Sequence, residues 1–434
     1  MKSRFLAFVM VVILSLSAFS VSFAGAADAE PVEIRAAWWG ETVRHDLYGQ
    51  ILDEFMKAYP HIKVISEPTS WNDYWDKMAV QTAGSNAPDF MCMHPQYASD
   101  YIGRGVMEPL DPFVADGTIS LDGWEQGVID TGVVDGTNYM MAMGVTFSSI
   151  FVNKTTMDAN GLAIPEAGWT WDDLKALGIE AREKFDANGK VDSYLFSDVS
   201  NAINQFRYFS RQQGHELYDT EGNVEFTAED IEKWFTMFNE FRDLGIVPDA
   251  ATSTEYYNAT LEDSPIAREI VMMNFVPINQ IALYNRTFPD RETIAIRHPG
   301  TAGGSVGEFP EGAHFGVSAN TTPEKKLAAA QLLNFWLNSA ESLKLFKLDQ
   351  GVPGNANLQD AYVPLLDENQ MIILNFVSDL MKVGTPTTFP PAGASEVDAM
   401  FKLVAEEVWF GMLTPADAAA RIVQEANTII EANK

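Results

Sequence analysis

The sequence predicts an α/β fold, and three observations indicate it. Short apolar segments typical of strands alternate with amphipathic segments typical of helices through the first third of the chain. The composition is 47% hydrophobic and 12% aromatic, which is sufficient for large buried cores. No long or biased linker divides the chain, so any separate lobes are expected to be joined by short crossings.

The first 26 residues have the pattern of a secretory signal. Lys2 and Arg4 precede a largely apolar stretch over 5–19, and the small residues Ala24-Gly25-Ala26 follow. We expect cleavage after Ala26 and export to the periplasm; the alternative, an uncleaved anchor, lacks a stop-transfer pattern. The single cysteine, Cys92, lies far from the cleavage position, so we expect no lipid anchor and a buried structural thiol.

The composition excludes several classes of partner. Without the signal the chain has 408 residues, with 27 basic and 60 acidic side chains and a net charge of −33. This charge repels phosphate backbones and anionic lipids, so neither nucleic acid nor a membrane surface is an expected partner. No later apolar run approaches the ~20 residues that a bilayer span requires.

The mature chain begins with a strand–helix–strand–helix–strand pattern. Strands are predicted over 32–38, 62–66 and 88–93, and helices over about 47–56 and 71–83. Strands connected through helices in this way are parallel, with right-handed crossovers. This part of the chain therefore predicts one α/β lobe.

The pattern continues after a turn-rich stretch. An extended segment is predicted over 139–152, followed by helices that begin near Thr155 and Thr170. Thr170 is a favourable N-cap because two aspartates lie in the first turn after it. A strand is predicted over 270–273. Further helices are expected over roughly 200–213, 227–244 and 323–349.

Five blocks of residues occur in a fixed order along nearly the whole mature chain. They are Trp38-Trp39-Gly40 with Arg44-His45, Trp71-Asn72-Asp73-Tyr74-Trp75, Tyr101-Ile102-Gly103-Arg104-Gly105, Asn160-Gly161-Leu162 with Trp169-Thr170-Trp171-Asp172-Asp173, and Phe315-Gly316-Val317-Ser318 with Gly351-Val352-Pro353. Each block is weak alone. In their joint order they resemble the extracellular sugar-binding proteins of ABC importers, the family that includes maltose-binding protein.

This resemblance implies a type II periplasmic binding protein-like fold. Two lobes would be joined by three hinge crossings, near 144–149, near 313–318 and after Gly351-Val352-Pro353, with the ligand cleft between the lobes. The implied division is residues 27–146 plus 317–352 for the N-terminal lobe and 147–316 plus 353–434 for the C-terminal lobe.

A sugar presents hydroxyls at its rim and C–H patches on its ring faces, so its site requires aromatic rings and hydrogen-bonding groups. Such groups lie in loops at the carboxyl ends of strands. In the N-terminal lobe the candidate ligand-binding residues are Trp39, Trp71, His94 and Gln96. Trp38, which alternates with Trp39, is expected in the core.

Arg44 is a further candidate, because a cation near a helix start opposes the helix dipole and therefore requires a partner. That partner is a sugar hydroxyl, a uronate carboxylate or Asp46. In the C-terminal lobe the candidates lie in the first crossing, on a helix and at a strand end, where the family often carries tryptophan. They are Phe147, Ser148, Gln205, Arg207, Asn274 and Phe275.

We therefore expect the periplasmic substrate-binding component of an ABC importer, a monomer that delivers an oligosaccharide to inner-membrane permease subunits. No cofactor, catalytic residue or metal ligand is expected. Because the acidic chain repels anions at long range, a neutral sugar is favoured over an acidic one. Two alternatives stay open: a periplasmic carbohydrate-active enzyme such as a glycosidase or lyase, or the same fold with a polyamine, metal chelate or peptide as ligand.

Overall fold

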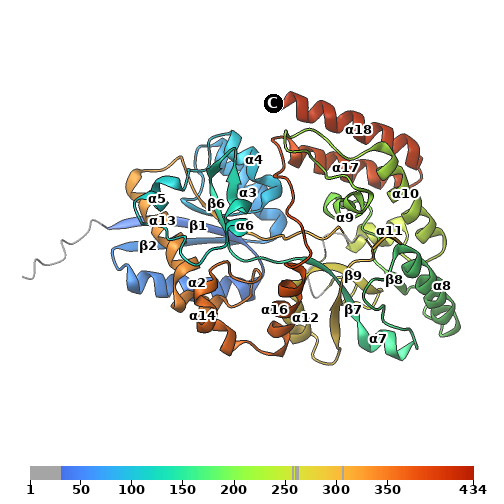
Figure 1. The fold of residues 1–434 in the computed structure, drawn as a ribbon. Coiled ribbons are helices and arrows are strands. Elements are labelled where there is room, and N and C mark those ends of the chain that lie inside the picture. Colours follow the sequence, from blue (N-terminus) through green and yellow to red (C-terminus); the bar gives the residue numbers. More distant parts are fainter. Residues whose placement is uncertain (1–30, 257–258, 260–262, 305–306) are drawn as a thin grey trace, which may run out of the picture.

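The computed structural model describes residues 31–434 except 257–258, 260–262 and 305–306, so the predicted signal peptide lies outside the described residues. Two β-sheets form the centres of two lobes that lie side by side (Figure 1). One buried hydrophobic cluster fills the first lobe and continues over part of the second sheet, and another fills the rest of the second lobe. The predicted α/β class and the two-lobed architecture are therefore confirmed.

The first sheet has the strand order β2-β1-β3-β11-β6. Strands β1 (Val32–Trp39), β2 (Ile62–Thr69) and β3 (Phe90–Met93) are parallel, as predicted, and helices α2 (Thr42–Ala58) and α3 (Trp71–Ala83) connect them. Strand β11 is antiparallel to both of its neighbours. The other elements of this lobe are α4 (Pro95–Gly103), α5 (Asp111–Ala115), α6 (Gln126–Ile129), β4 (Val133–Val134), β5 (Thr137–Asn138), β6 (Met140–Ala142), β11 (His314–Val317), α13 (Pro323–Asn338), α14 (Ala340–Phe346) and α15 (Gln359–Tyr362).

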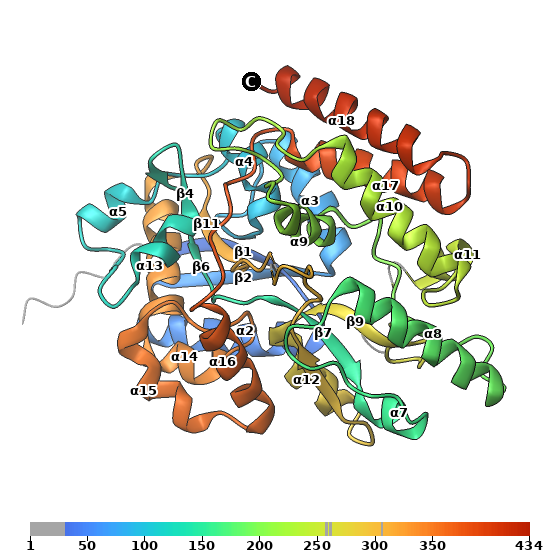
Figure 2. The same ribbon diagram turned by 45° about the vertical axis from the view of Figure 1, so that its right-hand side comes forward.

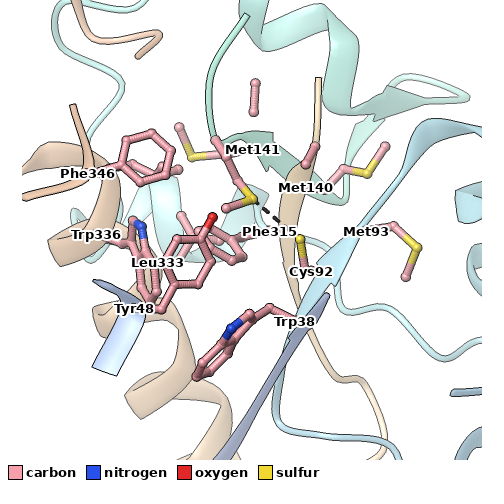
Figure 3. Close-up of a cluster of buried hydrophobic side chains, with 14 of the residues drawn as sticks. Trp38, Tyr48, Cys92, Met93, Met140, Met141, Phe315, Leu333, Trp336 and Phe346 are labelled. Atoms are coloured by element: carbon pink, nitrogen blue, oxygen red, sulfur yellow. Dashed lines mark hydrogen bonds between the residues drawn. The ribbon is translucent and has the colours of Figure 1, made fainter. Parts of the chain in front are cut away.

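The core of the first lobe is rich in aromatic and sulfur-containing side chains (Figure 3). Trp38 is 1% exposed, which confirms that it belongs to the core. The rings of Tyr48 and Trp336 meet edge to face with centroids 4.8 Å apart. Cys92 is buried as predicted, and its sulfur lies 3.4 Å from that of Met143.

The second sheet has the strand order β10-β7-β9-β8, and helices α10, α17 and α18 pack together beside it (Figure 2). Helix α8 begins at a capping box in which Thr170 and Asp173 bond reciprocally, so the predicted N-cap is confirmed. The elements of this lobe are β7 (Ser148–Asn153), α7 (Lys154–Ala159), α8 (Trp171–Ala187), β8 (Tyr194–Phe196), α9 (Ile203–Gln213), α10 (Ala228–Asp243), α11 (Ala250–Tyr256), β9 (Val271–Pro277), α12 (Ile281–Thr287), β10 (Thr293–Ile296), α16 (Glu368–Leu380), α17 (Ala394–Trp409) and α18 (Pro415–Ala432).

Two predicted elements are divided in the structure. The extended segment over 139–152 becomes β6 and β7, which belong to different sheets. The helix predicted over 323–349 becomes α13 and α14, because Ser339 has an extended backbone and caps α14 by accepting a hydrogen bond from the Ser342 amide.

The chain crosses between the sheets at three places. The first crossing joins β6 to β7, the second joins β10 to β11, and the third follows α14. Strand β11 begins at His314, so the second crossing precedes the predicted region 313–318 instead of occupying it. Tyr362 is still buried in the core of the first lobe, beyond the predicted boundary at 353. The exact lobe boundaries stay a prediction.

The three crossings touch one another at three glycines. Val145 exchanges two backbone hydrogen bonds of 2.8 Å with Val352, and Thr146 pairs similarly with Glu311. A Cβ atom on Gly312 would lie 2.3 Å from the carbonyl oxygen of Gly144, and one on Gly351 would lie 2.3 Å from that of Val145. Only glycine fits at these positions. Gly144, Gly312 and Gly351 are called the glycine node below.

Within the part of the chain that the structure describes, no helix combines the length and apolar character needed to cross a membrane.

We predict that Gly312→Ala lowers the free energy of unfolding by ~1–3 kcal/mol, because the added methyl group overlaps the backbone of another crossing. The matched control is Gly49→Ala in α2, where nothing lies within 4 Å of the new Cβ. That variant should gain up to ~1 kcal/mol from helix propensity. Denaturant unfolding measures the free energy of unfolding of both variants. An equal change in the two variants would contradict the crowding of the backbone at the glycine node.

Candidate functional site

A cavity of about 830 Å³ lies between the lobes and is called the main cavity. Its lining comes from the loops after β1 and β3, from the start of α3, from the crossings and from the start of β7. Six predicted site residues line it: Trp39, Arg44, Trp71, His94, Ser148 and Gln205. Residues from both lobes are thus brought to one space.

An aromatic cluster forms one wall of the main cavity. Ser70 caps α3 and places Trp71 at its first position. The rings of Trp39 and Trp71 are perpendicular, with centroids 4.9 Å apart, and Trp75 stacks on Tyr97 at 4.0 Å. Trp39 is 6% exposed and Trp71 is 36% exposed. Trp71 therefore presents its ring to the cavity while Trp39 supports it from behind.

Arg44 has a partner that sequence reasoning did not identify. Its Nε donates to Asp349 at 2.7 Å, and the Tyr48 hydroxyl donates to the same carboxylate at 3.1 Å. Both charged side chains are mostly buried. The carbonyl oxygen of Asp349 accepts from the side chain of Asn279 at 2.7 Å. Asp46 is one of three partners that the sequence indicates; in the structure Arg44 forms its ion pair with Asp349, beside the third crossing.

We predict that Arg44→Ala lowers the free energy of unfolding by ~1–3 kcal/mol, because Asp349 is left mostly buried without its cation. The double variant Arg44→Ala with Asp349→Ala should recover part of this loss, and a double-mutant cycle by denaturant unfolding measures the recovery. Wild-type stability with abolished ligand binding would show instead that Arg44 serves the ligand and not the fold.

A second cavity, of about 320 Å³, adjoins the main one and is called the carboxyl cavity. Glu311 and Asp398 contribute carboxyl groups to its lining, and Tyr218, Phe309 and Phe389 contribute aromatic rings. The predicted site residues Gln96 and Arg207 line this cavity. His94, Asn204, Glu311 and Gly312 line both cavities, so the two adjoin beside the glycine node.

Gln96 bridges the two lobes between the cavities. Its Nε2 donates to Asp398 on α17 at 2.5 Å, and its Oε1 accepts from Asn204 on α9 at 3.2 Å. Gln96 itself lies at the start of α4, where His94 is the N-cap. A single amide of the first lobe therefore contacts two helices of the second.

Burial and neighbouring charges set the ionisation of the groups at the junction. Burial raises the pKa of Glu311 to about 7, although Arg207 and Tyr208 act to lower it. Burial raises the pKa of Asp398 to about 6, although the bond from Gln96 acts to lower it. Burial lowers the pKa of His94 to about 4, so this imidazole is neutral at pH 7.

Arg207 is held by an ion pair within the fold and shares its carboxylate partner with a second arginine. Its Nε and Nη2 donate to the two carboxylate oxygens of Glu216 at 2.9 and 3.1 Å, and Arg211 bonds the same carboxylate. The guanidinium also lies 4.9 Å from the ring centroid of Phe309. This fork geometry is the strong form of an arginine–carboxylate pair.

The lobes are also joined at the start of α17. Its N-cap, Gly393, has no side chain to bond the first turn. Asp100 of α4 acts in its place, because its carboxylate accepts from the Gly393 amide at 2.8 Å and from the Ser395 hydroxyl. A helix of the second lobe is therefore capped by a residue of the first.

We predict that Asp100→Ala favours separation of the lobes. The capping bonds form only while the lobes are in contact, so their removal destabilises that arrangement by ~1 kcal/mol. The apparent dissociation constant should rise about fivefold, and solution scattering without ligand should give a larger radius of gyration. Asp76→Ala, at an exposed position of α3, is the control. Identical scattering and affinity in both variants would contradict a capping contact between the lobes.

Three predicted site residues are placed elsewhere. Phe147 is fully buried in the first core, and Phe275 is buried against Phe196 and His298. Neither lines the described cavities, so both assignments are corrected: Phe147 packs in the buried cluster that fills the first lobe and reaches the second sheet, and Phe275 packs against β8. Asn274 lines a separate small cavity of about 190 Å³, not the main cavity.

Other site residues were missed by sequence reasoning. Asn204, Asn279, Glu311, Asp349 and Asp398 carried no local signal, because each reaches the site from a distant part of the chain. Among the described residues, no group of three or more His, Cys, Asp or Glu side chains could hold a metal ion.

Two lobes, three adjacent crossings and a cavity between the lobes define the class of two-lobed solute-binding proteins. The chain belongs to the bacterial extracellular solute-binding proteins, whose family model matches residues 50–369. The expected family is thereby confirmed. As a member of it, the chain is a solute-binding protein of the ABC transporter type.

Solved structures share this fold. A periplasmic solute-binding protein from Pectobacterium atrosepticum and an oligogalacturonide-binding protein from Yersinia enterocolitica, the latter with saturated digalacturonic acid, are each 21% identical. Each match covers 93% of this chain and 99% of the other, with a TM-score of 0.81. An ABC substrate-binding protein from Listeria monocytogenes in complex with cycloalternan is 20% identical over 93% of this chain and 100% of that chain, with a TM-score of 0.77.

Proposed function

We propose that the protein binds an oligosaccharide in the main cavity and delivers it from the periplasm to the permease subunits of an inner-membrane ABC importer. The observation that carries this proposal is the exposed ring of Trp71 inside a cavity between two lobes. A volume of about 830 Å³ suits a ligand of more than one sugar ring.

Polar groups in the cavity wall support a hydroxylated ligand. The Ser148 hydroxyl and the Gln205 Oε1 are buried and have no hydrogen-bond partner among the described residues. Both residues line the main cavity. Buried polar groups without partners are unfavourable, and the hydroxyls of a sugar would satisfy them. An aromatic face beside unsatisfied donors and acceptors matches the two-sided chemistry of a sugar ring.

Two of the similar structures contain a bound carbohydrate, which supports a carbohydrate as the ligand. The Yersinia protein holds digalacturonic acid and the Listeria protein holds cycloalternan, both of them carbohydrates. The proposal is for binding without catalysis; the alternative is a carbohydrate-active enzyme. Incubation with oligosaccharides distinguishes them, because binding gives a stoichiometric heat whereas an enzyme gives shortened products.

A thermal-shift screen against a panel of oligosaccharides tests the proposal. Ligand at ~100 times its dissociation constant should add about 2.7 kcal/mol of stability, which raises the melting temperature measurably. Light scattering of the same sample reports whether the chain is a monomer. The proposal is wrong if polyamines, metal chelates or peptides raise the melting temperature and no carbohydrate does.

We predict that Trp71→Ala weakens oligosaccharide binding by ~1–3 kcal/mol, from lost apolar contact and aromatic stacking. The melting temperature without ligand should change little, because the ring is partly solvated. Phe410→Ala, at an exposed position after α17, is the control and should bind normally. Normal affinity with a much lower melting temperature would place Trp71 in the core and move the binding site elsewhere.

A further inference from the structure

We propose that the carboxyl cavity makes the site selective for uncharged sugar units: Glu311 and Asp398 accept hydrogen bonds from ligand hydroxyls and repel a uronate carboxylate. This inference rests on the proposed function and names the ligand class of the same site. It concerns the part of the site beside Gln96, where the two lobes meet.

The distribution of charge in this cavity carries the inference. Arg207 is the cationic residue in its lining, and two carboxylate oxygens of Glu216 already bond that guanidinium. The aromatic face of Phe309 covers the guanidinium further. Asp130, Glu311 and Asp398 are the acidic residues of the same lining. A uronate entering this space would meet three carboxyl groups and one guanidinium, which already bonds Glu216 together with Arg211.

The two carboxyl groups line the ligand space from different parts of the chain, Glu311 from the second crossing and Asp398 from the second lobe. The backbone of Glu311 is fixed by its hydrogen bonds to Thr146 beside the glycine node, which presents the residue to both cavities. Asp398 lies on α17, and Gln96 of the first lobe occupies one of its oxygens. Charge-assisted bonds from sugar hydroxyls to such partly desolvated carboxylates are stronger than neutral ones.

The alternative ligand for the carboxyl cavity is an acidic oligosaccharide such as the digalacturonic acid bound by the Yersinia protein. Long-range repulsion by the net charge of −31 over the whole chain adds to the local repulsion. Two unit charges at contact distances in a half-buried site interact by several-fold the thermal energy. The observations therefore favour the uncharged ligand.

A pH dependence of opposite sign for the two ligand classes follows. Hydroxyl donors favour the ionised carboxyl groups, so binding of a neutral sugar releases protons and weakens as the pH falls from about 8 to 5. A uronate stays ionised in this range and favours the protonated carboxyl groups, so its binding strengthens as the pH falls. The titratable and charged groups that face Glu311 and Asp398 are Arg207 and Tyr208 on α9, Lys402 on α17, Tyr218, His94, Asp130 and His314.

The experiment uses pairs of oligosaccharides that differ only at C6, with a hydroxymethyl group in one member and a carboxylate in the other. Glucose and glucuronate, galactose and galacturonate, and mannose and mannuronate oligomers are titrated into the full mature chain by calorimetry at pH 5, 6.5 and 8. The variants are Glu311→Gln and Asp398→Asn, with Glu396→Gln as the control at an exposed position of the same helix α17.

We expect the neutral member of the recognised pair to bind about tenfold or more tightly than the uronate at pH 8. Glu311→Gln and Asp398→Asn should narrow that preference and flatten the pH dependence, whereas Glu396→Gln should leave both unchanged. Equal or tighter uronate binding at pH 8 overturns the inference and leaves the proposed function intact. A preference that both variants preserve also overturns it. If no member of any pair binds at any pH, the proposed function fails together with the inference. The pH dependence of the wild type tests the inference even if a variant does not fold.

Discussion

The close approach of three backbone segments at the glycine node is the constraint on which the arrangement of the molecule depends. Gly144, Gly312 and Gly351 come from the three crossings, and the backbones beside them exchange hydrogen bonds. A side chain at Gly312 or Gly351 would displace a neighbouring crossing. The crossings are bonded to one another here. The two lobes, each built around its own sheet, therefore share a common pivot.

The node also determines where the polar groups of the site lie. Glu311 directly precedes Gly312, and Asp349 is two residues before Gly351, so both carboxylates are presented beside the pivot. Arg44 reaches Asp349 from the first lobe, while Asn279 reaches it from the second. The residues beside the hinge therefore contribute polar groups to the site, and Trp71 lines a different part of the cavity.

Local sequence patterns predicted what local interactions determine. The strands and helices of the first lobe follow from apolar periodicity, and the start of α8 follows from Thr170 and its aspartates. The positions of Trp39, Trp71 and Gln96 follow from the ends of parallel strands. The partners of these residues could not be predicted in this way, because Asp349 lies 305 residues from Arg44 and Asp398 lies 302 residues from Gln96. The first pair forms only after distant segments of the chain have packed against each other, and the second only when the lobes meet.

The two wrong phenylalanine assignments have a related physical cause. Strand β7 is central in its sheet and is buried along its whole length, and most of β9 is buried as well. Buried strands lack the polar alternation that would indicate which side chains face a cleft, so Phe147, directly before β7, and Phe275, within β9, could not be distinguished by pattern from the lining residue Ser148. In the first lobe the site residues lie at or just beyond the carboxyl ends of the parallel strands β1, β2 and β3. The position of these strand ends could be predicted from the sequence, whereas the face of a buried strand to which a side chain points could not.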